Sequence, residues 1–379
     1  MDVAHGHPQA PNASQIGVPG SRARLSTPAL ILDLTTFERN LRTMADLASS
    51  KNCSLRPHAK AHKCGKIGQR QVEAGAIGIS CATLQEAEAM AAAGIAGILI
   101  TTPVTSAAMI ARVIALNGSV ADFVIVVDHP DNLSALAAAA RAAGKPLSVL
   151  VDCDIGQNRT GAVGTEAVLE LARAAEAADS LRFRGLQAYY GHLQHIAVYR
   201  DRADATAEPR RFVRELVAKL SETGLPPEIV SGGGTGTHHI DMNDGVFTEI
   251  QAGSYPFMDS QYDSIQLWPD DPYPFANALF VQGTVVSLNQ TDLAVVDCGW
   301  KAFATESNPP KPVHVGKEYR FMGDEHGGVG LDDIWRPELG QAMTFKPPHC
   351  DPTVNLYSAF HCVRDDVLVD IWSIAARGY

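Results

Sequence analysis

The chain has no run of apolar residues long enough to cross a membrane. Among its 379 residues the longest apolar runs are short, for example 94–100 and 135–140, whereas a transmembrane helix needs roughly 18 to 20 residues. The opening residues, MDVAHGH, lack a basic segment followed by an apolar core, which a secretory signal would have. We therefore expect a cytoplasmic protein without a membrane partner.

Paired cysteines are also missing. The seven cysteines are scattered without a CxxC motif, and an odd number in a reducing compartment indicates free thiols rather than a disulfide framework. We expect most of them to be small core residues: Cys53, Cys64, Cys81, Cys153, Cys298, Cys350 and Cys362.

Positive charge is in deficit. Lys and Arg number 31 against 42 Asp and Glu, a formal net charge of −11, which argues against nucleic acid or an anionic membrane as a partner. Hydrophobic residues make up 46% of the chain and charged residues 19%, so the chain can bury a large core.

Short β-branched segments alternate with longer Ala-rich amphipathic segments from residue 28 onward, which is typical of βα units around a parallel sheet. Eight such strands in one stretch favour a (β/α)8 TIM barrel over 26–268 rather than an open sheet. The predicted strands are 54–59, 76–81, 97–101, 122–127, 147–152, 183–189, 228–231 and 249–252, and the predicted helices are 84–93, 106–116, 130–143, 165–178 and 208–223.

The pattern changes after residue 268. Short alternating segments at 280–287, 292–297 and 367–374, separated by Pro and Gly, predict a carboxy-terminal antiparallel β domain over 269–379. The proline-rich segment 269–274 is the expected junction. Residues 1–25 are polar and rich in Pro and Gly, which indicates a flexible amino-terminal arm.

Reactive side chains of barrels stand at the carboxyl ends of the strands. The first predicted strand ends in RPHAKAHK (56–63), where five of eight side chains are potentially cationic and Lys60 lies at the strand end. Desolvation and neighbouring positive charge can lower the pKa of such a lysine and make it an amine nucleophile. A solvated basic loop is the alternative interpretation.

Glycine-rich loops follow the seventh and eighth predicted strands, SGGGTGT at 231–237 and AGSY at 252–255. Loops at these two positions commonly bind phosphate in barrels, because glycine lets backbone amides approach the oxygens and Ser or Thr adds hydroxyl donors. A lysine together with a phosphate cradle suggests pyridoxal 5'-phosphate (PLP) as the cofactor. A flexible loop that binds no phosphate would have a similar glycine-rich sequence.

Two further strand ends carry candidate side chains. Arg159 follows the fifth strand and could donate to the phenolate oxygen of the cofactor, and Tyr189 follows the sixth and could stack on its ring. His192 and His195 lie in the same segment, and either could act as a general base. A surface arginine and packing of the aromatic residues remain the alternatives.

The carboxy-terminal domain contains KPPHCDPT at 346–353. If the prolines hold this backbone extended, His349 and Asp351 project to one side and can share a metal ion, while Cys350 points away. Imidazole plus carboxylate suits Mn, Mg, Co or Zn. The alternative is a rigid turn with a hydrogen-bonded histidine.

These motifs together resemble the fold-type III PLP enzymes of the D-threonine aldolase and D-serine dehydratase group, relatives of alanine racemase. The resemblance covers 27–379 and implies an amino-terminal barrel, a carboxy-terminal β domain and usually a homodimer. It depends on the segments 27–34 with Asn40, 56–63, 159–161, 231–235 and 348–355.

Position by position, the resemblance implies that Lys60 binds the cofactor covalently, that Arg159 reaches its ring oxygen and that Tyr189 lies against its ring. It further implies a phosphate site formed by Gly234, Thr235, Gly253 and Ser254, with Tyr255 close by. Dehydratases of this group resemble His-x-Cys and hold zinc, whereas D-threonine aldolases resemble His-x-Asp and use an ion such as manganese. His349 and Asp351 favour the aldolase branch.

The expected reaction is the metal-dependent cleavage of a D-3-hydroxy amino acid, such as D-threonine or D-allo-threonine, to glycine and an aldehyde. A histidine would remove the hydroxyl proton, with His195 preferred to His192. A metal-dependent dehydratase acting on D-serine or D-threo-3-hydroxyaspartate remains an alternative, since Cys350 lies between the two ligands. An amino-acid racemase and a non-catalytic PLP carrier are less favoured.

Overall fold

The computed structural model describes residues 11–313, 317–331 and 335–378. The described residues form two compact units. The barrel unit comprises Leu41–Tyr255 and Ser264–Pro274, and the sheet unit comprises the described residues of Met1–Asn40, Pro256–Asp263 and Phe275–Gly378. Among the described helices none is both long and apolar enough to span a membrane.

Eight parallel strands form the barrel unit, in the order β2-β9-β8-β7-β6-β5-β4-β3. An isolated parallel bridge between His58 and Ser80 connects the two ends of this order. The predicted barrel is thereby confirmed, and all eight strands lie within or beside the expected segments. They are β2 Ser54–Leu55, β3 Ile79–Cys81, β4 Ile98–Ile100, β5 Val124–Val127, β6 Leu147–Cys153, β7 Leu181–Ala188, β8 Ile229–Gly232 and β9 Glu249–Ile250.

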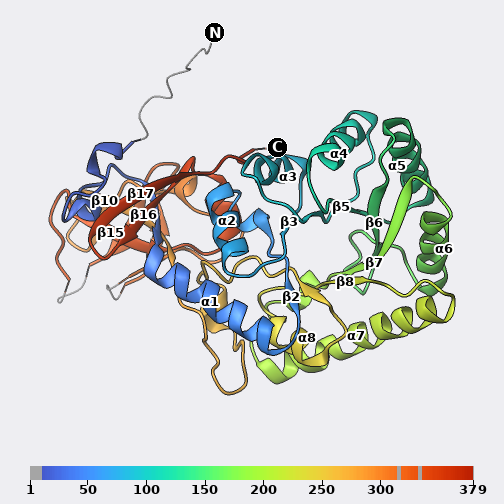
Figure 1. Cartoon of the computed structure of the whole chain (residues 1–379). Helices are drawn as coiled ribbons and strands as arrows, with labels where there is room; N and C mark the ends of the chain where they lie inside the picture. Colours follow the sequence, from blue (N-terminus) through green and yellow to red (C-terminus); the bar gives the residue numbers. More distant parts are fainter. Residues whose placement is uncertain (1–10, 314–316, 332–334, 379) are drawn as a thin grey trace, which may run out of the picture. The chain divides into compact units, whose positions relative to one another are not determined.

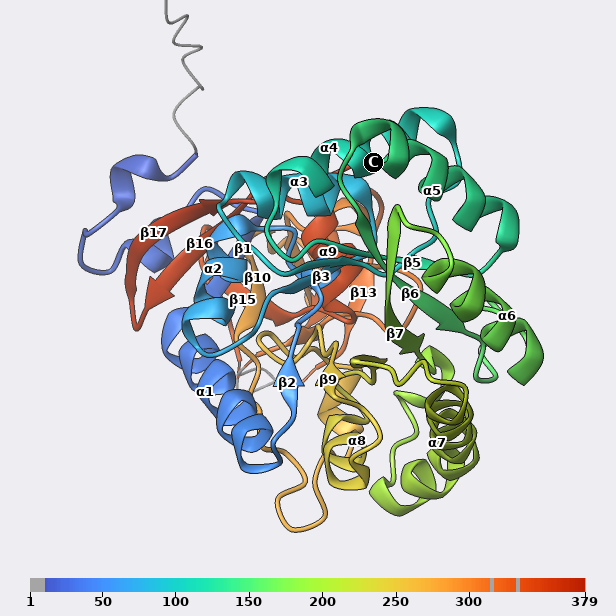
Figure 2. The same cartoon turned by 45° about the vertical axis from the view of Figure 1, so that its right-hand side comes forward.

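Helices follow the strands, and Figure 2 shows α3, α4, α5 and α6 along the outer side of β3 to β7. Local capping explains where several begin: the hydroxyls of Thr83 and Ser106 accept N–H bonds in the first turns of α3 and α4. The helices are α2 Gly65–Glu73, α3 Leu84–Ala92, α4 Ala107–Ser119, α5 Pro130–Ala143, α6 Thr165–Glu176, α7 Tyr199–Glu222 and α8 His238–Asp244; α1 is Leu34–Ser50.

Two barrel elements differ most from the predicted ranges. Strand β2 ends at Leu55 rather than at 59, because Pro57 cannot donate a ladder hydrogen bond and the chain turns into a 3-10 helix at Ala59–Ala61. Helix α7 begins at Tyr199 rather than at 208 and continues through Pro209, a residue that usually marks a helix start.

The sheet unit contains nine strands in one sheet, with the main order β13-β14-β11-β10-β1-β16-β17, and β15 paired with β10 and β12. Figure 1 shows β16 and β17 side by side. The pairing is mostly antiparallel, as predicted, but β1 and β16 are parallel. The strands are β1 Ala29–Asp33, β10 Leu279–Ser287, β11 Leu293–Val296, β12 Lys311–Pro312, β13 Tyr319–Phe321, β14 Gly327–Gly330, β15 Ala342–Lys346, β16 Ala359–Arg364 and β17 Val367–Ser373, and the helix α9 is Cys350–Asn355.

The compact units do not follow the ranges 1–25, 26–268 and 269–379. Strand β1, which falls in the range expected for the barrel, pairs with β10 and β16 instead. Its fully buried residues Ala29, Leu30, Ile31 and Leu32 form a continuous apolar stretch that needs cover on both faces. The chain leaves the barrel unit at Pro274, the last residue of the expected junction.

Residues 11–25, expected to form a flexible arm, make hydrogen bonds with the edge strand β17. The Gly17 N–H donates to the Leu368 carbonyl at 2.8 Å, and the Leu368 N–H donates to the Ser21 hydroxyl at 2.8 Å. These bonds occupy backbone groups that an edge strand otherwise exposes. Residues 1–10 of the expected arm lie outside the described residues.

Each unit has its own apolar core. One cluster inside the barrel unit consists of Leu99, Val124, Val126, Leu150 and Ile229, and one in the sheet unit consists of Leu25, Ala29, Ile31, Val363 and Leu368. Full burial of such a side chain stabilises the fold by roughly 1.5 to 3 kcal/mol. All seven cysteines are buried, which confirms the expectation of small core residues.

Candidate functional site

Lys60 lies in the 3-10 turn Ala59–Ala61 and not in the strand itself. The Lys60 N–H donates to the Nδ1 atom of His58 at 3.3 Å, and the Nε2 atom of His58 lies 3.2 Å from the Thr101 hydroxyl. These contacts fix the turn at the carboxyl end of β2. The side chain of Lys60 is partly buried, which suits an amine that must be reached by a ligand.

The cationic cluster around Lys60 is weaker than the sequence suggests. Arg56 forms a buried bidentate ion pair with Glu249, at 2.9 and 3.0 Å, and Lys63 lies 3.6 Å from Glu86. Burial, reinforced by Lys60, lowers the pKa of His58 well below its usual value, so this ring is neutral. Most of the five expected positive charges are therefore neutralised or absent.

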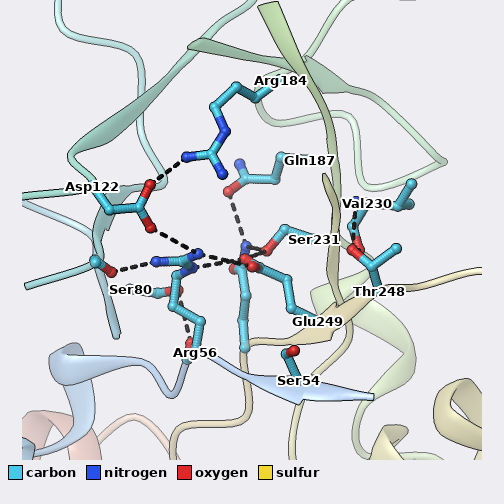
Figure 3. Close-up of polar contacts among 12 residues, drawn as sticks. Ser54, Arg56, Ser80, Asp122, Arg184, Gln187, Val230, Ser231, Thr248 and Glu249 are labelled. Carbon is cyan, nitrogen blue, oxygen red and sulfur yellow. Dashed lines mark hydrogen bonds and ion pairs between the residues drawn. The ribbon is translucent and has the colours of Figure 1, made fainter. Parts of the chain in front are cut away.

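The Arg56–Glu249 pair belongs to a polar layer inside the barrel, shown in Figure 3. Glu249 also accepts from the Ser231 hydroxyl at 2.7 Å, and Ser231 accepts from Gln251 at 2.8 Å. Gln251 in turn donates to Gln187 at 3.2 Å. This layer connects the floor of the barrel to residues that follow the strands, and it satisfies a buried charge that would otherwise be costly.

Thr235 joins the two glycine-rich loops. Its hydroxyl oxygen accepts the N–H groups of Ser254 and Tyr255, each at 3.1 Å. The second loop also lies against the Lys60 turn, since a Cβ placed on Gly253 would be 3.3 Å from the Cβ of His58. Three strand ends expected to share a site are thus brought together within the barrel unit.

The joined loops fit a phosphate group. Among the described residues, the backbone N–H groups of Thr235 and Gly253 donate to no acceptor, although both residues are buried. Buried amides are normally paired, so two such donors in adjacent glycine-rich loops suit an anion. The backbone N–H of Tyr255 donates to Thr235 and so helps to join the loops, while its buried hydroxyl accepts from Gln71.

Gln194 and His238 hold the first loop in place, and the motifs did not reveal either. Gln194 accepts from the Gly236 N–H at 2.9 Å and donates to the Thr237 hydroxyl at 3.1 Å. A Cβ on Gly234 would lie 2.6 Å from the Oε1 atom of Gln194, so a larger residue there would displace the Gln194 amide. His238 accepts from the Trp268 indole at 2.8 Å, and burial lowers its pKa to about 3.

Arg159 and Tyr189 lie together, with the guanidinium carbon 5.7 Å from the centre of the ring. The loop that carries Arg159 is anchored by Asp152, which accepts from Thr160 at 2.9 Å. Burial raises the pKa of Asp152 to about 6. A second anchor is Gln157, which accepts from the Gly191 N–H at 2.7 Å and so connects this loop to the segment after β7.

His192 and His195 are both exposed and lie beyond Tyr189 in that segment. Their exposure leaves both rings accessible to a small molecule. Tyr190, between them and Tyr189, is buried and donates to Asp241 of α8. Burial raises the pKa of Asp241 to about 6.

His349 and Asp351 lie together in the sheet unit, with 4.0 Å between Nε2 and Oδ1. The expected extended backbone is wrong, because α9 begins at Cys350. Pro352 falls in the first turn, where its missing N–H costs no helical hydrogen bond. His349, which precedes the helix, has extended backbone angles.

The expectation that Cys350 points away from the pair is wrong, because Cys350 donates from its thiol to the Asp351 carboxylate. Its side chain is fully buried, its N–H donates to Asp259 at 2.8 Å, and its thiol lies 3.2 Å from Oδ1 of Asp351. Sequence reasoning missed Glu306, whose carboxylate lies 2.7 Å from Nδ1 of His349. Among the described residues there is no group of three or more His, Cys, Asp or Glu side chains that could hold a metal ion.

Comparison with known proteins also divides the chain into two parts. The family model "Alanine racemase, N-terminal domain" matches residues 32–261, and "Putative serine dehydratase domain" matches 278–363. The chain is 41% identical over 359 residues to a D-threonine aldolase of Arthrobacter sp, covering 94% of both proteins. The chain belongs to the D-threonine aldolase-like family.

Other relatives support this membership. A 3-hydroxy-D-aspartate aldolase of Paracoccus denitrificans (strain Pd 1222) is 38% identical over 369 residues, which covers 95% of both proteins. The crystal structure of D-threonine aldolase from Filomicrobium marinum superposes with a TM-score of 0.90 at 40% identity, over 93% of this chain and 96% of that one.

Membership defines the class of chemistry. This D-threonine aldolase-like protein is a carbon–carbon lyase, since relatives at about 40% identity over nearly the whole length are aldolases. Its alanine racemase-like domain implies PLP as the cofactor. The phosphate-compatible loops and the partly buried Lys60 of the barrel unit suit that cofactor.

Proposed function

We propose that the protein is a PLP- and divalent-metal-dependent D-threonine aldolase that cleaves D-3-hydroxy amino acids to glycine and an aldehyde. The observation that carries the proposal is the pair His349 and Asp351, with 4.0 Å between Nε2 and Oδ1. Imidazole plus carboxylate is the donor set that suits manganese, magnesium or cobalt, and also zinc. Manganese is the metal we propose first.

The barrel unit would hold the cofactor. Lys60 would bind it covalently, Arg159 would donate to its ring oxygen and Tyr189 would lie against its ring. The phosphate would lie on Gly234, Thr235, Gly253 and Ser254, beside Tyr255, where Thr235 already joins the two loops. When bound, PLP stabilises the negative charge that cleavage leaves on Cα, and the metal ion lowers the pKa of the substrate hydroxyl.

Cleavage of D-threonine requires one proton to leave the 3-hydroxyl and one to reach Cα. The Cα–Cβ bond breaks, the hydroxyl oxygen becomes the carbonyl of acetaldehyde and the remaining fragment becomes glycine. A neutral imidazole can accept the hydroxyl proton. We assign this role to His195, with His192 as the second choice.

Product analysis tests the proposal. The protein is saturated with PLP and Mn²⁺ and incubated with D-threonine, and the products are identified by chromatography. Glycine and acetaldehyde in equal amounts would support the aldolase, whereas 2-oxobutanoate and ammonia would identify a dehydratase. L-threonine serves as the control for configuration.

The preferred substrate side chain needs a separate comparison. One relative with similar identity is a 3-hydroxy-D-aspartate aldolase, and both candidate substrates are D-3-hydroxy amino acids that would yield glycine. We propose D-threonine and D-allo-threonine. A kcat/KM for 3-hydroxy-D-aspartate more than tenfold above that for D-threonine would overturn this choice and leave the aldolase reaction intact.

We also propose that the protein is a cytoplasmic homodimer, as the family resemblance implies. Light scattering coupled to size-exclusion chromatography would give twice the 40.4 kDa mass of the chain. A single-chain mass across the micromolar range would overturn the dimer.

A further inference from the structure

Glu306 contacts the histidine of the proposed metal pair from a distant part of the sequence. It lies between the 3-10 helix Trp300–Ala302 and β12, separated from His349 by 43 positions. Its carboxylate oxygen is 2.7 Å from Nδ1 of His349. The Glu306 side chain is 49% exposed, so burial does not force this contact.

The two ring nitrogens of His349 face different carboxylates. Nδ1 lies at Glu306, and Nε2 lies 4.0 Å from Oδ1 of Asp351. A carboxylate that accepts from Nδ1–H fixes the tautomer in which the lone pair is on Nε2. The distance to Asp351 is below about 4.2 Å, the largest separation of two donor atoms each about 2.1 Å from one ion.

We propose that Glu306 is a positioning residue that orients His349 for metal binding through Nε2 and is not itself a ligand. This inference rests on the proposed function, which assigns His349 and Asp351 to the metal. The Glu306 carboxylate lies at Nδ1, whereas the Asp351 carboxylate faces Nε2, the other nitrogen of the ring.

Metal titration tests the proposal. Metal-free holoenzyme, loaded with PLP, is titrated with Mn²⁺, and unbound Mn²⁺ is measured by electron paramagnetic resonance. Loss of such an outer carboxylate typically weakens metal binding by about 10- to 100-fold, and we expect this for Glu306→Gln. Glu338→Gln, which removes the same charge from an exposed residue of the sheet unit, should leave the Kd within twofold.

A second measurement does not depend on metal at all. Nitrogen-15 NMR of the histidine rings in the metal-free protein should show His349 as the Nδ1–H tautomer, with the signal assigned by its loss in His349→Asn. Glu306→Gln should shift the ring to a mixture of tautomers. An Nε2–H ring in the unaltered protein, or a Kd for Glu306→Gln within twofold of the unaltered protein, would overturn the proposal.

The outcome is separable from that of the proposed function. If D-threonine cleavage requires Mn²⁺ but Glu306→Gln binds Mn²⁺ normally, the role of Glu306 fails and the aldolase stands. If no D-3-hydroxy amino acid is cleaved, yet Glu306→Gln weakens Mn²⁺ binding and changes the tautomer, the role of Glu306 stands and the aldolase fails.

Discussion

The candidate cofactor site of the barrel unit and the metal pair of the sheet unit are built in different ways. In the barrel unit, loops from separate strands are joined by buried hydrogen bonds, such as those from Ser254 and Tyr255 to Thr235. In the sheet unit, His349 and Asp351 are neighbours in sequence at the start of one short helix. The first site depends on the whole fold, and the second depends mainly on local geometry and a few flanking groups.

This difference predicts that one substitution in the barrel unit removes the cofactor itself. Lys60→Ala should abolish the visible absorbance of bound PLP and lower kcat/KM by at least about 10³-fold, because the covalent attachment is lost. Lys66→Ala, an exposed lysine of α2, is the matched control and should behave like the unaltered protein. Persistent cofactor colour in Lys60→Ala would show that another residue binds PLP.

In the sheet unit, loss of the metal should stop catalysis but leave the cofactor bound. Asp351→Asn or treatment with a chelator should lower kcat by about 10²-fold or more, with the PLP absorbance retained. Manganese should restore the chelated protein but not the variant. Activity that is insensitive to the chelator would contradict metal dependence and would favour a metal-free racemase.

The two exposed histidines can be ranked by their effect on the proton transfer. His195→Gln should lower kcat by about 10²- to 10⁴-fold, the usual contribution of a general base, whereas His192→Gln should have a smaller effect. Rate measurements from pH 6 to 9 on both variants would check this. The reverse order would assign the base to His192.

The bonds between the barrel loops should also be measurable. Thr235→Val leaves the N–H groups of Ser254 and Tyr255 without their acceptor, and an unsatisfied buried donor costs about 1 to 3 kcal/mol. We expect PLP to bind about 10- to 100-fold more weakly, as measured by fluorescence titration. Thr235→Ser keeps the hydroxyl and should bind PLP nearly normally; equal weakening in both variants would contradict a role for this oxygen.

The smallest expected effect concerns stability in acid. The pKa of His238 is about 3 in the folded protein because of burial, against about 6.5 in an unfolded chain. As the pH falls from 7 to 5, the unfolded state takes up a proton that the folded state cannot, so folding loses about 2 kcal/mol. His238→Asn should show a correspondingly flatter dependence of unfolding free energy on pH, measured by urea denaturation, whereas His129→Asn at an exposed position should not.

Much of the fold could be predicted from the sequence. The eight barrel strands follow from β-branched segments spaced by Ala-rich helices, and these periodic patterns are local. Strand β1 could not be assigned to the sheet unit in this way, because an apolar segment such as Ala29–Asp33 fits either a barrel or a sheet. Its assignment depends on pairing with β10 and β16, which are far away in the sequence.

The residues of the candidate sites also divide into those that a local sequence pattern predicts and those that it does not. Lys60, the glycine-rich loops and the pair His349 and Asp351 are recognisable because each is a short contiguous motif. Gln194, His238 and Glu306 are not, since each acts through contacts with residues outside its own segment. A polar side chain of this kind has no periodicity or spacing to mark it.

The sequence by itself determined which chemical groups the protein has: a lysine after a strand, phosphate-compatible loops and an imidazole–carboxylate pair. Only the tertiary structure decided the state of those groups. It pairs Arg56 with Glu249 and makes His58 neutral by burial. It also places the Thr235 hydroxyl where it connects the two glycine-rich loops, and the Glu306 carboxylate beside His349. The physical reason is that residue types and local spacing are encoded along the chain, whereas desolvation and hydrogen-bond partners exist only after distant segments have packed together.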